Sequence, residues 1–211
     1  MHKRVDKIVI KCLYTTSPCF YLMKYKLLPN HEIEYNGLTA KAVNPEDIEF
    51  IRKCRNSQKD ILRQNKDIEA DSQLLYFKQV VWPQLDLEKP NLILLSLFRD
   101  EQIIGYGGLV HISWENNRAE VSFLVSHQIR KDKDLYESTF NDFLCLIKKI
   151  SFELLKLSRI YTETFDIRPL HISILEKNGF MLEGRLISHV IINKKDVDSL
   201  MHGCLRTNYE F

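Results

Sequence analysis

The 211-residue sequence contains only seven glycines, and none of them lies between residues 109 and 178. It has no apolar run approaching the about 20 residues that a membrane-spanning helix needs. Its 30 lysines and arginines are nearly balanced by 28 acidic residues, so no excess of charge indicates a nucleic-acid partner. We therefore expect neither a membrane protein nor a nucleic-acid-binding protein.

The five cysteines are scattered, with no Cys-x-x-Cys pair and no cluster with histidine. This pattern is typical of reduced thiols in a cytoplasmic protein and argues against a disulfide framework or a metal site. Residues 8–23 are fairly apolar, but Lys11 interrupts them and no small-residue cleavage site follows cleanly. Met23 is a plausible alternative start, which would make residues 1–22 a disordered or artefactual extension.

The stretch 103–123 predicts two β-strands joined by a polar turn at 115–118. Gly105, Gly107 and Gly108 lie within the first of these strands, where glycine indicates a bulge or a close approach of backbones. Taken alone, this pattern favours an ordinary bulged hairpin packed in a core.

The rest of the chain predicts an alternation of strands and helices in one domain. Before the hairpin we expect a strand at 38–43, helices at 44–56 and 71–82, and a strand at 91–98. After it we expect a polar loop at 126–134, an amphipathic helix at 135–157, a strand at 160–164, a helix at 169–178 closed by Gly179, and strands at 181–192 and 197–205.

The segment Ser173-Ile174-Leu175-Glu176-Lys177-Asn178-Gly179-Phe180, followed by Glu183-Gly184-Arg185-Leu186, resembles the closing signature of the Gcn5-related N-acetyltransferases. Arg55-Asn56, Gly105-Tyr106-Gly107-Gly108 and Asp198 fit the branch that acetylates ribosomal-protein N-termini and sugar amines. The likeness is greatest to enzymes that N-acetylate a nucleotide-linked 4-amino sugar in pseudaminic acid synthesis.

This resemblance covers residues 38–206 and implies an α/β fold with a mixed, mostly antiparallel twisted sheet of about seven strands flanked by helices. Residues 1–37 are then an N-terminal extension. It also implies acetyl-CoA as co-substrate, lying in a gap between the strands at 120–125 and 160–164, and direct transfer to an amine in a ternary complex. The N–H groups near Leu124, Val125 and Ser126 are the expected donors to the thioester carbonyl and the pantetheine arm.

The chain departs from the family at the site of the coenzyme A diphosphate. The family places a glycine-containing loop, Arg/Gln-x-x-Gly-x-Gly/Ala, ahead of the long helix, because backbone amides must approach the diphosphate closely. Here the loop has no glycine, and Arg130, Lys131 and Lys133 would supply charge, with Arg168 also expected at the cofactor. A solvated charged loop is the alternative.

A second departure concerns proton transfer. The family often has a tyrosine at the position of Leu175 that protonates the leaving thiolate, and this chain lacks it. We predict His171 or Tyr161 as the substitute acid and Glu163 as the base for the amine. The alternatives are a structural histidine and a strand surface.

The acceptor is expected between the early helices, the turn at 114–118 and the last hairpin. The candidate contacts are Arg55, Asn56, Trp114, Glu115, Asn117, Asp198 and His202. The preferred acceptor is a small-molecule amine, an amino sugar on a nucleotide carrier, and the alternative is a protein N-terminal amine. A non-catalytic domain that has kept the fold is a third possibility. We expect a monomer or a homodimer.

Overall fold

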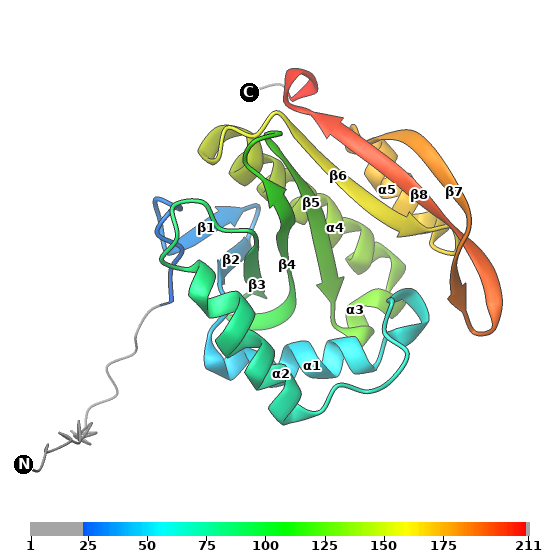
Figure 1. Cartoon of the computed structure of the whole chain (residues 1–211), viewed down its shortest axis with the longest axis horizontal. Helices are drawn as coiled ribbons and strands as arrows, with labels where there is room; N and C mark the ends of the chain where they lie inside the picture. The colour runs from blue at the N-terminus through cyan, green and yellow to red at the C-terminus, as the bar shows by residue number, and fades with distance from the viewer. Residues whose placement is uncertain (1–22, 210–211) are drawn as a thin grey trace, which may run out of the picture.

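The computed structural model describes residues 23–209, so the predicted extension at 1–22 lies outside the described residues. A single eight-stranded sheet runs through the described part in the order β1-β2-β3-β4-β5-β6-β8-β7 (Figure 1). Its strands are β1 (Glu32–Tyr35), β2 (Leu38–Ala42), β3 (Ile93–Arg99), β4 (Gln102–Ser113), β5 (Arg118–Val125), β6 (Arg159–Phe165), β7 (Met181–Ile192) and β8 (Lys195–Leu205). All neighbouring strands are antiparallel except β5 and β6. The expected mixed, mostly antiparallel sheet is confirmed.

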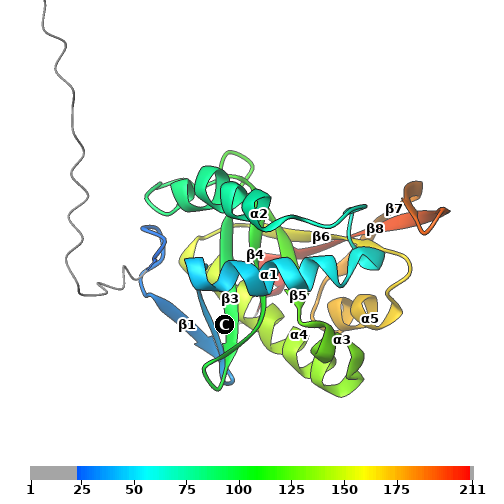
Figure 2. The ribbon, with the colours of Figure 1, turned by 90° about the horizontal axis from the view of Figure 1, so that it is seen from below.

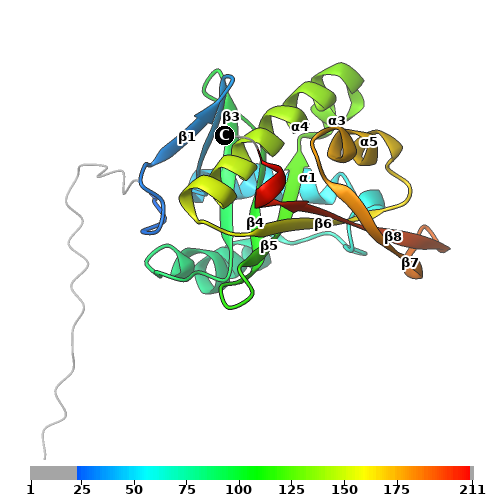
Figure 3. The ribbon, with the colours of Figure 1, turned by 90° about the horizontal axis from the view of Figure 1, so that it is seen from above.

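Helices cover both faces of the sheet. They are α1 (Ile48–Asn56), α2 (Ala70–Tyr76), α3 (His127–Lys131), α4 (Lys133–Lys148) and α5 (Pro169–Lys177). Figures 2 and 3, which view the molecule from opposite sides, show α1 and α2 on one face and α3, α4 and α5 on the other. A 3₁₀ turn at Pro45–Asp47 leads into α1, and wider π-helical turns continue α2 over Phe77–Val81 and α4 over Lys149–Leu154.

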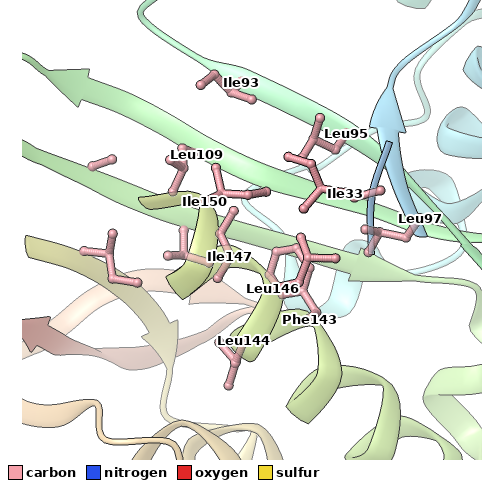
Figure 4. Packing of buried hydrophobic residues seen from close by; sticks show 14 of the residues in the cluster. Ile33, Ile93, Leu95, Leu97, Leu109, Phe143, Leu144, Leu146, Ile147 and Ile150 are labelled. Atoms are coloured by element: carbon pink, nitrogen blue, oxygen red, sulfur yellow. The ribbon is translucent and has the colours of Figure 1, made fainter. Parts of the chain in front are cut away.

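The core has two parts, one on each face of the sheet. On the first face, Phe143, Leu146 and Ile147 of α4 pack against the inward side chains of β3 and β4 (Figure 4). On the other face, Ile51 of α1 and Phe77 beyond α2 belong to a smaller cluster. Burial of these apolar side chains, about 1.5–3 kcal/mol each, fixes which strand residues face which layer of helices.

Residues 23–37, placed by the sequence in the N-terminal extension, contribute to the larger part of the core. The Tyr25 side chain is only 1% exposed, and its hydroxyl accepts a hydrogen bond from the Leu94 N–H at 2.9 Å. β1 pairs with β2 from Glu32↔Lys41 to Tyr35↔Leu38, and this short strand is absent from the sequence prediction. It raises the strand number from about seven to eight.

The glycines of β4 mark close approaches of backbones. A Cβ on Gly107 would lie 2.6 Å from the Ser122 carbonyl oxygen and 2.8 Å from the Phe143 ring. A Cβ on Gly108, whose φ is +146°, would lie 1.9 Å from the Ile93 carbonyl oxygen. The predicted reason for glycine in this strand is therefore confirmed at these two positions.

The predicted polar loop at 126–134 is wrong in one respect, since it contains the short helix α3. The Ser126 hydroxyl caps this helix by accepting from the Ile129 N–H at 3.3 Å, and Asp132 caps α4 by accepting from the Leu135 N–H at 3.0 Å. Serine and aspartate are both strong N-cap residues, so the side chains expected in a loop instead begin two helices.

Candidate functional site

The site is built where two parallel strands separate. β5 and β6 pair only over Arg118↔Arg159, Ala119↔Ile160 and Glu120↔Tyr161, after which the strands diverge (Figure 1). A cavity of about 370 Å³ lies there, bounded by β4, β5, β6, α4, α5 and the segment 57–69 that links α1 to α2. We call this cavity the cleft. Its volume is within the range typical of small-molecule sites.

Beyond its short pairing with β6, the edge of β5 presents main-chain groups on the side away from β4. The Val125 carbonyl accepts a hydrogen bond from Gln58 Nε2 at 2.8 Å and so points away from β4. Because the N–H and C=O of one residue in an antiparallel ladder point to the same side, the Val125 N–H also faces away from β4. The Ser126 N–H, in contrast, donates to the Ile104 carbonyl at 2.8 Å, and by the same alternation the Leu124 N–H faces Tyr106 of β4. Of the three predicted donors, only Val125 thus faces the divergence of the strands.

Two carboxylates face the cleft from neighbouring strands. Burial raises the pKa of Glu120 on β5, an effect that the nearby Glu163 reinforces and His111 opposes. Burial acts to raise the pKa of Glu163 on β6, but its ion pair with Arg63, together with Ser199 and His189, outweighs burial and leaves the pKa below its usual value. Glu120 is therefore the more basic of the two carboxylates and has no ion-pair partner in the described part of the chain.

His111 enters the cleft because of a bulge in β4. The register between β4 and β5 shifts between Val110 and Ser113, and the φ of His111 is +50°. The shift brings the His111 side chain to the same cavity as Glu120. Neither residue was among the sequence candidates. The alternation Glu120–Ser122 on one face of β5 was the signal for Glu120, whereas no sequence pattern identifies the bulge at His111.

His171 lies at the start of α5 within a buried polar cluster. Its Nδ1 is 2.7 Å from the Tyr136 hydroxyl, which accepts a hydrogen bond from Arg168 Nη2 at 2.9 Å. Burial, helped by the charge of Arg168, lowers the pKa of His171 well below its ordinary value. The imidazole is thus neutral at neutral pH, and its Nδ1 accepts the Tyr136 O–H. Its ring stacks on Phe140 with centroids 4.1 Å apart.

This cluster is continuous with the cleft. Arg168 and His171 line both the cleft and a smaller cavity of about 170 Å³ that also contains Tyr136. Sequence reasoning named Arg168 and His171 but missed Tyr136, because its place on α4 reads as part of an apolar stripe. The buried Tyr136 hydroxyl therefore lies on the α4–α5 side of the sheet. The family's usual tyrosine on that side is replaced by Leu175, which has no hydroxyl.

Tyr161 lies at the closed end of the strand pair, opposite Glu120. Its ring is flanked by the Arg118 and Arg159 guanidinium groups, 5.5 and 5.9 Å from the ring centroid. Burial and the neighbouring Glu120 carboxylate raise the pKa of Tyr161. It is thus beside the candidate base and not among the residues that line the cleft with His171.

The basic residues ahead of α4 divide into two kinds. Arg130 forms a bidentate ion pair with Asp60, with N–O distances of 2.9 and 2.6 Å, and so ties the 57–69 segment to α3. Lys131 and Lys133 are exposed and form no ion pair within residues 23–209. Only these two lysines present free charge near the positive end of the α4 dipole.

The predicted acceptor contacts are separated in the structure. Arg55 lines the cleft, whereas Asn56 holds the 57–69 segment through hydrogen bonds to the Ile68 backbone at 2.9 and 3.0 Å. Trp114 donates to the Pro90 carbonyl at 2.9 Å and packs against the core, outside the cleft lining. The turn residues Glu115 and Asn117 are exposed and do not line the cleft either.

The two residues predicted on the final strand have structural contacts. Asp198 accepts from Arg185 at 2.7 Å and from the Ser188 N–H at 2.9 Å, which supports the β7–β8 hairpin. The His202 side chain is fully buried, with its Nε2 3.8 Å from the Glu176 carboxylate. The structure therefore brings neither residue into the cleft lining.

Within residues 23–209, no three or more His, Cys, Asp or Glu side chains gather in a way that suits a metal ion. In the same part of the chain, no helix is long and apolar enough to cross a membrane.

Residues 40–201 match the model of a family described as an acetyltransferase (GNAT) domain. Among solved structures, the chain is similar to the Vibrio cholerae spermidine N-acetyltransferase in complex with coenzyme A and spermine, with a TM-score of 0.71 and 20% identity. That match covers 82% of this chain and 98% of the other. The V. cholerae spermidine/spermine enzyme with manganese ions gives a TM-score of 0.64 and 21% identity over 82% of this chain and 95% of that one. No curated protein matches the chain.

The predicted superfamily is confirmed by the family match. The branch within it is not, since the similar structures named above are spermidine N-acetyltransferases and not enzymes of the pseudaminic acid type. At 20–21% identity these structures bear on the fold alone.

Proposed function

The chain belongs to the acetyltransferase (GNAT) domain family, and on this basis we propose that it transfers an acetyl group from acetyl-CoA to the amine of a small molecule. The observation that carries this proposal is the cleft itself. It combines the edge of β5 that β6 leaves unpaired beyond Glu120 with a carboxylate of raised pKa, Glu120, that forms no ion pair within residues 23–209.

The residues of the α4–α5 side suit the acyl donor. The Val125 N–H can donate to an extended amide-containing chain, as a neighbouring strand would, whereas the Val125 carbonyl already accepts from Gln58. Lys131, Lys133 and the beginning of α4 would face the phosphates. Acetyl-CoA supplies an activated thioester when bound. The chain's own groups bind the substrates and move the protons.

Proton transfer divides between the two faces of the sheet. Glu120 is the proposed base for the amine, because a raised carboxylate pKa increases its basicity near neutral pH. On the opposite side, Tyr136 with Arg168 and His171 would hold a proton for the leaving thiolate. Glu163 is held by Arg63 and is proposed to orient the acceptor. The role of Tyr161 as the acid for the thiolate stays a prediction. Its position opposite Glu120 favours an influence on the Glu120 carboxylate instead.

For the acceptor, we retain an amino sugar on a nucleotide carrier as the first candidate, on the strength of the sequence resemblance. A protein N-terminal amine is the second candidate. The enzymes with a similar fold are spermidine N-acetyltransferases, so a polyamine is the third class of acceptor to compare with these two candidates. The cytoplasmic location, and the choice between monomer and homodimer, stay predictions from the sequence.

The first test measures acetyl-CoA binding by calorimetry and coenzyme A release in the presence of amines. Saturable binding and amine-dependent release are expected. Binding without release for any amine of the three classes would favour a non-catalytic domain, and absence of binding would contradict the proposal.

The second test is Glu120→Gln. Turnover should fall about 100- to 10,000-fold, the usual contribution of general base catalysis, with acetyl-CoA affinity little changed. Because the carboxylate must be deprotonated and its pKa is raised, wild-type kcat/KM should fall on the acid side at a pH above that of an ordinary glutamate. The variant should lack this acid limb. Glu88→Gln, an exposed glutamate paired with Lys26, is the control. Retention of more than half the turnover by Glu120→Gln would place the base elsewhere.

A further inference from the structure

A second cavity adjoins the cleft on the face covered by α1 and α2. Its volume is about 360 Å³, and it shares three lining residues with the cleft: Arg55, Val110 and Ser122. Ser122 lies two residues beyond Glu120 on the same face of β5, so the two cavities meet beside the candidate base. We call the second cavity the side pocket.

Arg55 stands at this junction with its charge uncompensated. Its Nη1 donates to the Tyr106 hydroxyl at 2.9 Å, and within residues 23–209 it forms no ion pair. The other arginines nearby are paired: Arg52, on the same helix, forms a double hydrogen bond with Glu49, and Arg63 pairs with Glu163. A half-buried guanidinium has five donors and cannot lose its charge, so four unused donors beside a cavity indicate an anionic ligand.

Two further polar groups are available to the same ligand. Tyr106 accepts from Arg55, so its own O–H has no partner in the described part of the chain. Burial raises the pKa of Tyr106, which keeps that proton in place at neutral pH. The Gln73 side chain is only 4% exposed, lines the side pocket, and forms no hydrogen bond among the described residues. The Gln73 amide is not among the fully enclosed polar atoms and opens to the side pocket without a protein partner, so Gln73 is a second, independent indication of a ligand.

The remaining walls are apolar or aromatic. Phe77, Leu94 and Tyr76 line the side pocket, and no Asp or Glu of residues 23–209 is among its lining residues. Such walls favour a ring or another flat apolar group over an extended cationic chain. A polyamine in the side pocket would place a second cation beside Arg55, with no carboxylate among the pocket's lining residues to offset the repulsion.

We propose that the side pocket binds the non-reacting part of the acceptor, and that this part is a ring or apolar group carrying a carboxylate or phosphate. Arg55 and the Tyr106 O–H bind the anion, Gln73 binds a polar edge, and the amine reaches past Ser122 to Glu120. This inference rests on the proposed function. The proposed acceptor is anionic and therefore differs in charge from spermidine, the substrate named for the enzymes with a similar fold.

The test uses acceptors in matched pairs: 4-(aminomethyl)benzoate against benzylamine, and O-phosphotyramine against tyramine, with spermidine as the polyamine. The anionic member of at least one pair should have the larger kcat/KM, and which pair shows the preference distinguishes carboxylate from phosphate. Arg55→Gln should remove about 10- to 100-fold of this preference, as expected for a charge-assisted hydrogen bond. Arg55→Lys should retain part of it. Lys53→Gln, which removes an exposed charge from the same helix, should retain all of it.

A binding experiment separates this inference from the proposed function. Phenyl phosphate and benzoate, which have no amine, are tested by ligand-observed NMR, with benzyl alcohol as the neutral control. Binding of an anion that Arg55→Gln abolishes and Lys53→Gln preserves would support the side pocket even if no amine is acetylated. Equal use of charged and neutral amines, preference for spermidine, or anion binding that is indifferent to Arg55 would overturn the inference.

Discussion

At the scale of single residues, burial sets the protonation state of His171 before any substrate is present. The neutral imidazole accepts from Tyr136, which itself accepts from Arg168, so the three groups form one directional chain of hydrogen bonds. Protonation of His171 would place a second positive charge beside Arg168 and remove the acceptor of the Tyr136 O–H. The cluster is thus compatible with a neutral histidine only.

This state has a consequence for stability. Because the folded-state pKa of His171 lies below that of an unfolded histidine, the unfolded chain binds more protons, and the free energy of unfolding falls as pH drops below about 6.5. His171→Asn should make the decrease in the free energy of unfolding between pH 7 and pH 5 smaller by about 1–2 kcal/mol. This expectation does not depend on how the substitution changes stability at pH 7. Urea unfolding at both pH values measures this. His31→Asn, at an exposed position, is the control, and an unchanged pH dependence in His171→Asn would contradict the account.

Single residues were predicted unevenly from the sequence. Glu163 was predicted from its place on a strand expected to face the gap, and Arg168 and His171 from their places ahead of and at the start of the short helix; all three line the cleft. Tyr136 and Glu120 were missed, since a tyrosine in an apolar stripe and a glutamate in an alternating strand look ordinary until the fold places them. Their chemical significance comes from burial, which no local pattern reports.

At the scale of elements, β4 depends on glycine at a position where no side chain fits. Gly108→Ala would force an alanine to φ +146° and drive its Cβ against the Ile93 carbonyl of the neighbouring strand. We expect a loss of about 2–4 kcal/mol in the free energy of unfolding, from backbone strain and overpacking together. Gly184→Ala, where nothing lies within 4 Å of the added Cβ, should change stability by less than about 0.5 kcal/mol. Denaturant unfolding compares the two, and equal effects would contradict this role of Gly108.

The start of α4 carries the second prediction about elements. Lys131→Ala combined with Lys133→Ala should weaken coenzyme A binding about 3- to 10-fold and leave pantetheine binding unchanged, because exposed lysines act on the phosphates as modest point charges. Lys194→Ala with Lys195→Ala, at the tip of the β7–β8 hairpin, is the matched control. Calorimetry measures both ligands. An equal loss of affinity for pantetheine would place the two lysines away from the phosphates.

The order of elements was largely predictable, because periodicity and capping residues are local properties. The helix that begins after Asn44-Pro45 and the short helix ending before Gly179 lie where their caps indicate. β1 was missed because four residues carry too little pattern, and its stability comes from pairing with β2. α3 was missed because its sequence is charged and polar, and Ser126 was not recognised as its cap.

At the scale of the whole molecule, the divergence of β5 and β6 joins two layers that the sheet otherwise separates. α3, α4 and α5 lie on one face, and α1, α2 and the 57–69 segment lie toward the other (Figures 2 and 3). The cleft is lined from both, with His171 and Phe140 from one side and Arg55 and Arg63 from the other. An acyl donor and an acceptor can therefore approach through different faces and occupy the molecule together.

The cysteines and the serine nearest to the cleft are not suited to carry the acetyl group in a covalent intermediate. No cysteine among the described residues lines it, and burial raises the pKa of the nearby Cys54 to about 12, which suppresses its thiolate. The Ser122 hydroxyl lines the cleft but makes no hydrogen bond to a base within residues 23–209. Neither Cys54 nor Ser122 is therefore activated to form an acetylated intermediate.

We therefore expect a sequential reaction in which both substrates are bound before transfer. Initial velocities measured against acetyl-CoA at several fixed concentrations of an accepted amine should give intersecting double-reciprocal lines, and the protein incubated with acetyl-CoA alone should keep its mass. Cys54→Ser and Ser122→Ala should retain the intersecting pattern, since neither residue carries the acetyl group. Parallel lines, together with an acetylated protein detected by mass spectrometry and lost in one of these variants, would identify a covalent intermediate. That outcome would contradict direct transfer across the sheet and leave the cleft as a site for two half-reactions.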